Sequence, residues 1–188
     1  EWMSFNFGPT LLTWMERHSP DVYARVLEGD KKSLARLGHG NALAQIYHHV
    51  IMPLATDRDK RREVAWAVDD FKARFGRDPE GMWLSETAVD TPTLEALAQA
   101  GIRFTILAPS QATAVSDNGR DWRGVDAGSL DIRRPYAVRL PSGREIAVFF
   151  YHGPLSQAVA FEKLLGDGEQ FFRRLSGAAG EGLLSLAT

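Results

Sequence analysis

Glu86 is the residue whose type and surroundings most clearly indicate chemistry. It follows Met82-Trp-Leu-Ser85 and precedes Thr87-Ala-Val89, so a carboxylate lies within an apolar and partly aromatic stretch. Burying a charged carboxylate costs several kcal/mol unless the group is paired or used. We therefore expect Glu86 to be functional. The alternative is a structural carboxylate stabilised by the dipole of a helix that begins near Thr91-Pro92.

Other polar residues end apolar segments in the same way. They are Asn6, His48, His49, Ser110, Gln111, Tyr151 and His152. Ligand sites in barrels and open α/β sheets lie at the carboxyl ends of the strands, so parallel strands would bring these groups to one face. For each of these residues taken alone, a loop position with a local hydrogen bond is as good an explanation as a role in a ligand site. Side chains alternate along a strand, so only one of His48 and His49 is expected to serve the site if residues 42–49 stay extended.

Strand-like and helix-like segments alternate along the chain, which indicates a parallel sheet covered by helices. Strands are expected at residues 2–7, 42–47, 81–85, 102–107 and from 183 onward, and helices at 21–37, 60–75, 91–100, 155–165 and 169–175. Residues 116–134 are polar and predict a long loop, whereas 136–140 and 144–151 predict a β-hairpin. The pattern therefore predicts an α/β fold, either an open sheet or a barrel.

Composition and charge argue against several classes of function. A net charge of −2 provides no field that would attract a phosphate backbone, so no nucleic-acid partner is expected. The chain has no cysteine, which excludes disulfides and thiolate metal sites. No stretch approaches the ~18 apolar residues of a membrane helix, and the first residues lack a signal-peptide pattern. We expect one domain over residues 1–188, cut from a longer protein at both ends, with no membrane partner and a cytoplasmic location.

Two motifs resemble those of glycoside hydrolase family 57. Gly81-Met-Trp-Leu-Ser-Glu-Thr-Ala-Val-Asp90 is similar to the segment that carries the family's nucleophilic Glu, and His49-Val-Ile-Met-Pro53 is similar to the preceding motif. Segments 4–9 and 104–108 resemble the neighbouring strands. The likeness covers nearly the whole chain and is greatest to a subgroup with an extra C-terminal domain of unknown function. Ser85 and Val50 depart from it, since each stands where the family commonly has Pro.

This resemblance implies a partial (β/α)7-type barrel of parallel strands and outer helices, with one β-hairpin insertion. It implies a retaining glycoside hydrolase or glucanotransferase that acts on α-glucans or oligosaccharides, with Glu86 as the nucleophile. A nucleophile must stay ionised, so a hydrogen-bond donor or positive group is expected beside Glu86. The family's acid/base is an Asp on a later strand, expected just beyond Thr188, so the isolated fragment is expected to be inactive.

The resemblance also implies substrate contacts. His49 would hydrogen-bond hydroxyls of the sugar in the cleavage subsite. Asn6, Gln111 and His152 are expected as further sugar contacts. Trp83 is expected to stack on a sugar ring, although its place within a strand favours core packing. No cofactor and no metal is expected.

Two other functions remain open at this point. One is a carbohydrate-binding barrel that has no catalytic activity. The other is a metal-dependent barrel of the polysaccharide deacetylase type with His48, His49 and Glu86 as ligands, although the Asp/His ligand motifs of such enzymes are not visible. A barrel cut at both ends exposes sheet edges, so self-association of the truncated chain is also expected.

Overall fold

A computed structural model describes residues 3–187, so Trp2 and Thr188, which belong to expected strands, lie outside the described residues. The chain divides into two compact units. Unit 1 comprises the residues up to Thr105 together with Val138–Ile146, and unit 2 comprises Ile106–Ala137 and Ala147–Thr188. The expectation of a single domain stays a prediction. Within residues 3–187, no helix has the length and apolar character needed to cross a membrane.

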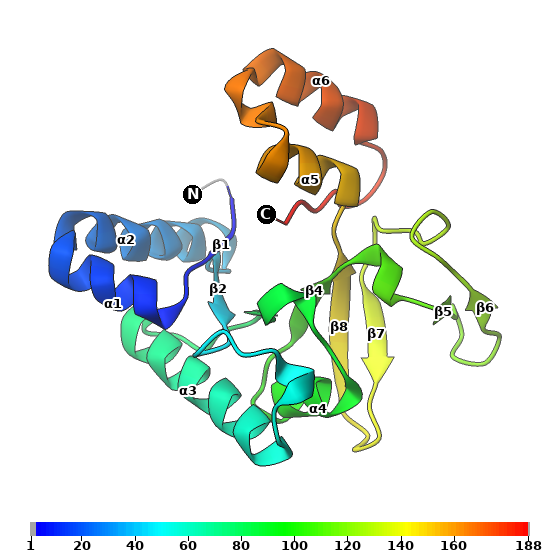
Figure 1. Cartoon of the computed structure of the whole chain (residues 1–188), viewed down its shortest axis with the longest axis horizontal. Coiled ribbons are helices and arrows are strands. Elements are labelled where there is room, and N and C mark those ends of the chain that lie inside the picture. Colours follow the sequence, from blue (N-terminus) through cyan, green and yellow to red (C-terminus); the bar gives the residue numbers. More distant parts are fainter. Residues whose placement is uncertain (1–2, 188) are drawn as a thin grey trace. The chain divides into compact units, whose positions relative to one another are not determined.

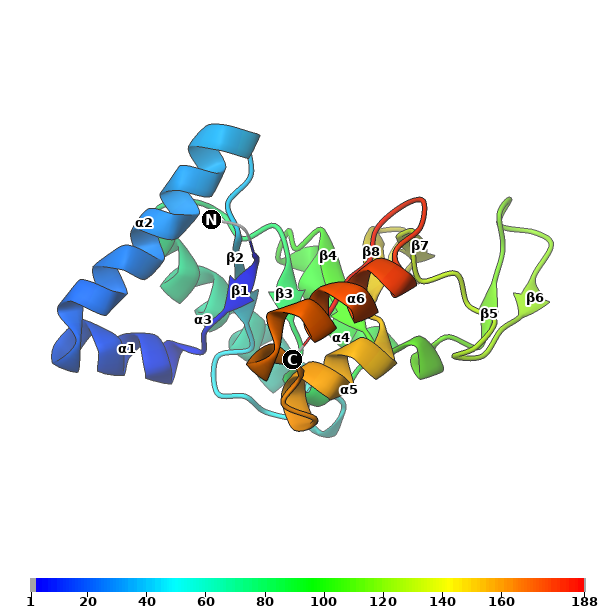
Figure 2. The same cartoon turned by 90° about the horizontal axis from the view of Figure 1, so that it is seen from above.

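Unit 1 is built on short parallel strands that are joined by helices (Figures 1 and 2). The strands β1 (Phe5–Asn6), β2 (Ala42–Gln45) and β3 (Met82–Trp83) form a sheet in that order, and a parallel bridge from Gly81 to Phe104 leads to β4 (Phe104–Leu107). The helices are α1 (Pro9–His18) and α2 (Pro20–Leu37) after β1, α3 (Asp57–Phe75) after β2 and α4 (Thr91–Gln99) after β3. Alternating parallel strands and helices confirm the expected fold class.

The helix α3 shows how the sequence produces this layering. The Thr56 side chain accepts a hydrogen bond from the Asp59 amide at 3.3 Å and caps the amino end, while Gly76 ends the helix in the left-handed region at φ 68°. Val64, Ala67, Phe71 and Phe75 are buried, as the helical spacing predicts. The expected helix over 60–75 is therefore confirmed, with one additional turn at its start.

One face of the sheet in unit 1 is buried under α3. Ala44 of β2 lies beside Met82 of β3, and both side chains are buried. Phe5 lies beside Ala42 on the same face, and its ring centroid is 6.4 Å from that of Phe75 on α3. The hydrophobic effect thus fixes the register, because a slip of one residue would move this apolar set to the other face.

The opposite face of the sheet is only half-buried and carries the polar strand ends. Gln45 lies beside Trp83, and Asn6 lies beside Leu43; all four are partly exposed. This is the face from which a site at the carboxyl ends of the strands would be built.

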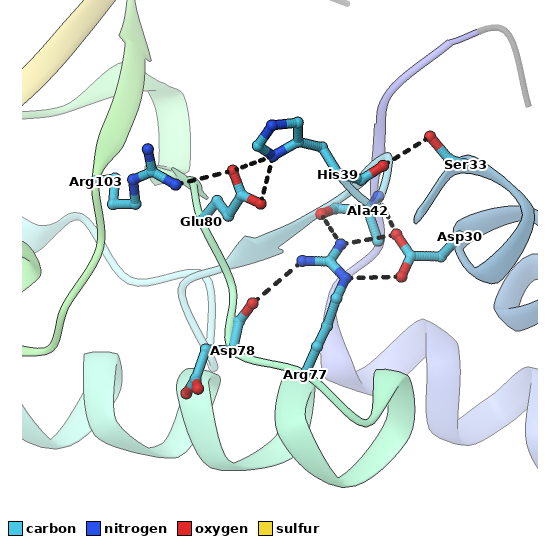
Figure 3. Close-up of polar contacts among 8 residues, drawn as sticks. All are labelled: Asp30, Ser33, His39, Ala42, Arg77, Asp78, Glu80 and Arg103. Atoms are coloured by element: carbon cyan, nitrogen blue, oxygen red, sulfur yellow. Dashed lines mark hydrogen bonds and ion pairs between the residues drawn. The ribbon is translucent and has the colours of Figure 1, made fainter. Parts of the chain in front are cut away.

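A buried ion pair ties the amino end of β2 to α2 and to the residue after Gly76 (Figure 3). Arg77 donates two hydrogen bonds to the carboxylate of Asp30, at 2.8 Å from Nε and 2.7 Å from Nη2, and Asp30 is 1% exposed. Asp30 also accepts from the Ala42 amide at 2.8 Å, and Arg77 donates to the Ala42 carbonyl at 3.0 Å. A Cβ at Gly40 would lie 2.2 Å from the guanidinium, so glycine is needed there. The polar side chains at this end of unit 1 thus stabilise the fold.

The same end of unit 1 holds His39. Its Nδ1 lies 2.8 Å from Glu80 Oε1, and Arg103 Nη1 lies 3.4 Å from the other oxygen of the same carboxylate (Figure 3).

Unit 2 contains α5 (Gly153–Phe161) and α6 (Gly168–Ala178), which pack around Leu155, Ala158 and Leu164. The expected hairpin is present as β7 (Tyr136–Arg139) and β8 (Glu145–Phe150), which join β4 in a sheet of order β4-β8-β7. Gly143 adopts φ 82° in its turn, in the region that favours glycine.

Two sequence expectations need correction, and one helix was missed. The polar segment 116–134 is not entirely a loop, because β6 (Arg123–Gly124) pairs with β5 (Ala114–Val115). The helix α1 was not predicted from the sequence. The strand expected from Leu183 is absent from residues 183–187: the Leu183 amide donates to the Arg133 carbonyl and the Ala187 amide to the Ser156 hydroxyl, so no strand ladder satisfies this backbone.

Candidate active site

Glu86 is presented by a tight turn directly after β3. Leu84 and Ser85 are fully buried at 0% exposure and anchor the chain before the turn. Glu86 (φ 54°) and Thr87 (φ 53°) then adopt left-handed backbone conformations, within a 3-10 turn over Ser85–Thr87. This conformation is unfavourable for residues other than glycine, and such strain clusters at functional sites. The turn leaves the Glu86 side chain 74% exposed at the carboxyl end of the strand.

His49 reaches Glu86 from the loop that follows β2. Ile46 and Met52 are fully buried and fix both ends of this loop. The His49 amide donates to the Ile46 carbonyl at 3.3 Å, and His49 is itself left-handed at φ 56°. Its Nε2 atom lies 3.4 Å from Oε1 of Glu86. The hydrogen-bond donor that was expected beside the carboxylate is therefore an imidazole from the neighbouring strand.

Gln45 completes this set and was missed from the sequence. Its Nε2 lies 2.8 Å from His49 Nδ1. The amide N–H donates there, so Nδ1 is the acceptor and Nε2 carries the proton that faces Glu86. The available signal was a lone polar residue in the run Ala42-Leu-Ala-Gln-Ile46.

His48 turns away from this set. Its backbone N–H donates to Glu63 Oε2 at 2.9 Å, and its Nδ1 lies 2.8 Å from Glu63 Oε1. Only His49 of the pair lies beside Glu86. The condition under which the sequence predicted one serving histidine, an extended segment over residues 42–49, is not met, because β2 ends at Gln45 and His49 adopts a left-handed backbone in the turn that follows. Which of the two histidines serves the site stays a prediction.

Asn6 and Trp83 lie on the same face of the sheet as Gln45. Trp83 is the register neighbour of Gln45, and Asn6 ends β1; both are partly exposed. Trp83 is thus on the opposite face from the buried Met82. Their contacts with sugar stay predictions.

Gln111 and His152 belong to unit 2 and make local backbone contacts. Gln111 Oε1 accepts from the Ala108 amide at 2.8 Å. His152 Nδ1 accepts from the Leu155 amide at 3.1 Å and caps α5. These contacts match the alternative of loop residues with local hydrogen bonds, and the role of both residues in sugar binding also stays a prediction.

A buried ion pair fixes the chain just after Glu86. Lys60 of α3 is 3% exposed and donates to Asp90 Oδ2 at 2.6 Å, while Asp90 Oδ1 accepts from the Thr93 amide at 2.9 Å and caps α4. Burial by itself would raise the pKa of Asp90, but hydrogen bonds from Lys60 and Thr93 outweigh it and hold the pKa below its usual range. The segment from Glu86 to Asp90 is therefore held at both ends.

The chemistry of this set is that of an exposed carboxylate with one adjacent ring N–H donor. Such a carboxylate suits nucleophilic attack or proton transfer. Within residues 3–187, no three His, Cys, Asp or Glu side chains are grouped so as to hold a metal ion.

Curated proteins with similar sequences include two enzymes. The curated alpha-amylase 1 of Dictyoglomus thermophilum is 23% identical over 179 residues, which are 95% of this chain and 23% of that protein. The 4-alpha-glucanotransferase of Thermococcus litoralis is 23% identical over 105 residues, which are 56% of this chain and 15% of that protein. The chain thus spans less than a quarter of the length of these curated relatives.

Solved structures share the fold. The exo-type maltose-forming amylase from Pyrococcus sp. ST04 matches with a TM-score of 0.74 at 21% identity, over 98% of this chain and 30% of that one. The Thermococcus litoralis 4-alpha-glucanotransferase matches with a TM-score of 0.69 at 19% identity, over 98% of this chain and 26% of that one. These likenesses confirm the expected fold class, that of (β/α)7-type barrel enzymes. The model of glycosyl hydrolase family 57 matches residues 2–184, and the chain therefore belongs to that family.

Proposed function

We propose that this chain supplies the nucleophile of a retaining enzyme that acts on α-glucans, and that Glu86 is that nucleophile. The observation that supports this most is the 3.4 Å approach of His49 Nε2 to Glu86 Oε1 on a strained turn at the end of β3. The names of the relatives, an alpha-amylase and a 4-alpha-glucanotransferase, support the substrate class.

The first chemical step is attack by a Glu86 oxygen on the anomeric carbon of a bound glucose unit. The C–O bond to the leaving sugar breaks as the ester bond forms, and a second carboxylic acid protonates the leaving oxygen. That acid then becomes the base that deprotonates water or an acceptor sugar, which displaces Glu86. In retaining enzymes the two carboxyl groups lie about 5–5.5 Å apart. We propose that the second carboxylate comes from outside residues 1–188.

His49 has two tasks in this proposal. Its Nε2–H holds the Glu86 carboxylate in one orientation before attack, and Gln45 keeps the ring in the tautomer that allows this. Its second task would be to hydrogen-bond a hydroxyl of the sugar in the cleavage subsite. Asn6 and Trp83 on the same sheet face would provide further sugar contacts.

The decisive experiment uses the full-length protein with a panel of α-1,4- and α-1,6-linked glucans. We expect products that retain the α configuration when followed by NMR from the first turnover. A 5-fluoro-α-glucosyl fluoride should label the protein covalently, and peptide mapping should find the sugar on Glu86. Labelling of a different residue, or products with inverted configuration, would reject the assignment.

The matched control for this test is Glu80→Gln. Glu80 lies six residues before Glu86 in the chain, but it is at the amino end of β3, paired with His39 and Arg103. Glu86→Gln should lower kcat by about three orders of magnitude or more, as loss of a nucleophile does elsewhere. Glu80→Gln should leave kcat unchanged.

A second test uses residues 1–188 alone. Since we propose that the acid/base lies elsewhere, residues 1–188 alone should show no glucan turnover. The exposed edges of the parallel strands should also lead to self-association in size-exclusion chromatography. Turnover by this piece would place the acid/base within residues 1–188.

A further inference from the structure

A hollow lies in unit 1 on the exposed side of α3, apart from the Glu86 turn. Its volume is about 530 Å³, and its lining residues are Tyr47, His48, Trp66, Asp69, Asp70 and Ala73. This volume falls within the ~300–1,000 Å³ that is usual for ligand sites. None of these residues belongs to the set formed by Gln45, His49 and Glu86. We call this hollow the Trp66 groove.

Aromatic rings form one part of the Trp66 groove. Trp66 is 46% exposed although it lies on a helix whose apolar residues are otherwise mostly buried. Its ring centroid is 6.0 Å from that of Tyr47 and 5.7 Å from that of His48, both edge-to-face. Tyr47 and His48 are also edge-to-face at 4.7 Å. These contacts fix the plane of the indole and leave much of it open to solvent.

His48 is held in the groove by a buried carboxylate. Glu63 is 7% exposed, and its two oxygens accept from the backbone N–H and the ring Nδ1 of His48, at 2.9 and 2.8 Å. A buried charge is costly unless it is fully hydrogen-bonded, so this pairing orients the exposed ring firmly. Because Nδ1 is engaged with Glu63, Nε2 is the polar ring atom that remains for a ligand.

Carboxylates form the other part of the groove. Trp66, Asp69, Asp70 and Ala73 follow one another at helical spacing along α3 and therefore share one face. Asp70 is engaged with Arg74, whose Nε lies 3.0 and 2.9 Å from its two oxygens. The Asp69 carboxylate makes no hydrogen bond or ion pair within residues 3–187. The neighbouring Lys72 acts on it electrostatically but is paired with Asp78 at 2.8 Å, so the Asp69 oxygens can accept hydrogen bonds.

We propose that the Trp66 groove is a second α-glucan-binding site, distinct from the Glu86 turn. The indole would stack on the apolar face of a glucose ring, while Asp69 and His48 Nε2 would hydrogen-bond its hydroxyls. The Asp69 carboxylate disfavours phosphates and other anions, and the small apolar area disfavours a helix or a lipid surface. The choice of glucan over other neutral sugars rests on the proposed function. Anchoring a long chain at two points raises its affinity without affecting short chains.

The test compares the full-length wild type with Trp66→Ala, Trp66→Phe and Trp122→Ala. Trp122 is 66% exposed in the polar segment of unit 2 and serves as the matched control for loss of an exposed indole. Binding is measured by affinity electrophoresis in gels that contain soluble amylose. Turnover is measured on amylose and on maltotetraose.

Trp66→Ala should weaken amylose binding about tenfold and raise the KM for amylose, while its kcat and KM on maltotetraose stay at wild-type values. Trp66→Phe should restore most of the binding, and Trp122→Ala should bind as the wild type does. Amylose binding by Trp66→Ala equal to that of the wild type would overturn the proposal. So would shielding of Trp66 from acrylamide quenching in the full-length protein, because another part of the protein would then cover the groove.

The experiments can reject either proposal without rejecting the other. If Glu86→Gln keeps full turnover while Trp66→Ala loses amylose binding, the nucleophile assignment is wrong and the groove stands. If Glu86→Gln is inactive while Trp66→Ala binds amylose normally, the groove is wrong and the nucleophile stands.

Discussion

The Nε2 atom of His49 lies 3.4 Å from Oε1 of Glu86, and both residues have left-handed backbones, at φ 56° and 54°. Each side chain is held at its place by a turn that follows a parallel strand. Two strained turns on neighbouring strands thus bring a carboxylate and a ring N–H together. Such an arrangement persists only where the surrounding structure determines it strongly, and here Leu84, Ile46 and Met52 do so through complete burial.

The first prediction concerns the imidazole. His49→Asn should lower kcat/KM on α-glucans about tenfold, because it removes a hydrogen bond to a charged group that is worth ~1.5 kcal/mol or more. Asn tolerates the left-handed backbone, so the melting temperature should stay near that of the wild type. Steady-state kinetics and calorimetry measure the two effects. His39→Asn is the control, and an equal loss of activity there would argue against a specific role for His49.

The second prediction concerns Gln45. In Gln45→Glu, the new carboxylate favours the tautomer with the proton on Nδ1, so the Nε2–H donor that faces Glu86 is lost. kcat/KM on α-glucans should therefore fall about tenfold, as in His49→Asn. Gln45→Leu should also lower kcat/KM, because nothing then holds the ring in one tautomer, and wild-type kinetics in Gln45→Glu would reject the role.

The third prediction concerns Ser85. Its hydroxyl is fully buried and has no hydrogen-bond partner within residues 3–187. An unsatisfied buried hydroxyl costs roughly 1–3 kcal/mol, so Ser85→Ala should raise the free energy of unfolding by about 1 kcal/mol. Thr105→Val is the counterpart, because Thr105 Oγ1 donates to the Met82 carbonyl at 2.9 Å and its removal should destabilise. Urea denaturation of both variants tests the pair, and destabilisation by Ser85→Ala would contradict the expectation.

The fourth prediction concerns Lys60 and Asp90. Lys60→Met removes the only cation that hydrogen-bonds Asp90 within residues 3–187, at 2.6 Å, and should lower the free energy of unfolding by about 2–3 kcal/mol near neutral pH. The exposed i,i+4 pair of Lys32 with Glu28 offers a control, since Lys32→Met should leave the free energy of unfolding close to that of the wild type. Thermal and urea denaturation at pH 7 measure the difference.

The pairing of Lys60 with Asp90 also makes the free energy of unfolding depend on pH. The pKa of Asp90 is lowered in the folded protein, so its contribution to stability is complete above the unfolded pKa of ~3.9 and is lost as the pH falls through the lower folded value. The stability difference between wild type and Lys60→Met should therefore be constant above about pH 5 and should shrink below about pH 4. A difference that grows on acidification would contradict this reading.

Much of unit 1 was predictable from the sequence, because its signals are local. The apolar spacing of Val64, Ala67, Phe71 and Phe75 specifies the buried face of α3, and Gly76 specifies its end. The polar break after Met82-Trp-Leu-Ser85 located Glu86 at the end of a strand. The helix α1 was missed because Gly8-Pro9 resembles a loop, although Pro suits the first turn of a helix.

The sequence alone determined the motif around Glu86, the alternation of strands and helices, and His49 as a candidate residue for sugar binding. Only the tertiary structure decided that Gln45 joins them, that His48 turns to Glu63 and that Trp66 meets Tyr47 over an exposed hollow. The physical reason is that helical and strand periodicity depend on near neighbours in the chain. By contrast, the left-handed turns at His49 and Glu86 are imposed by packing between neighbouring strands, and the two residues themselves are 37 positions apart in the sequence.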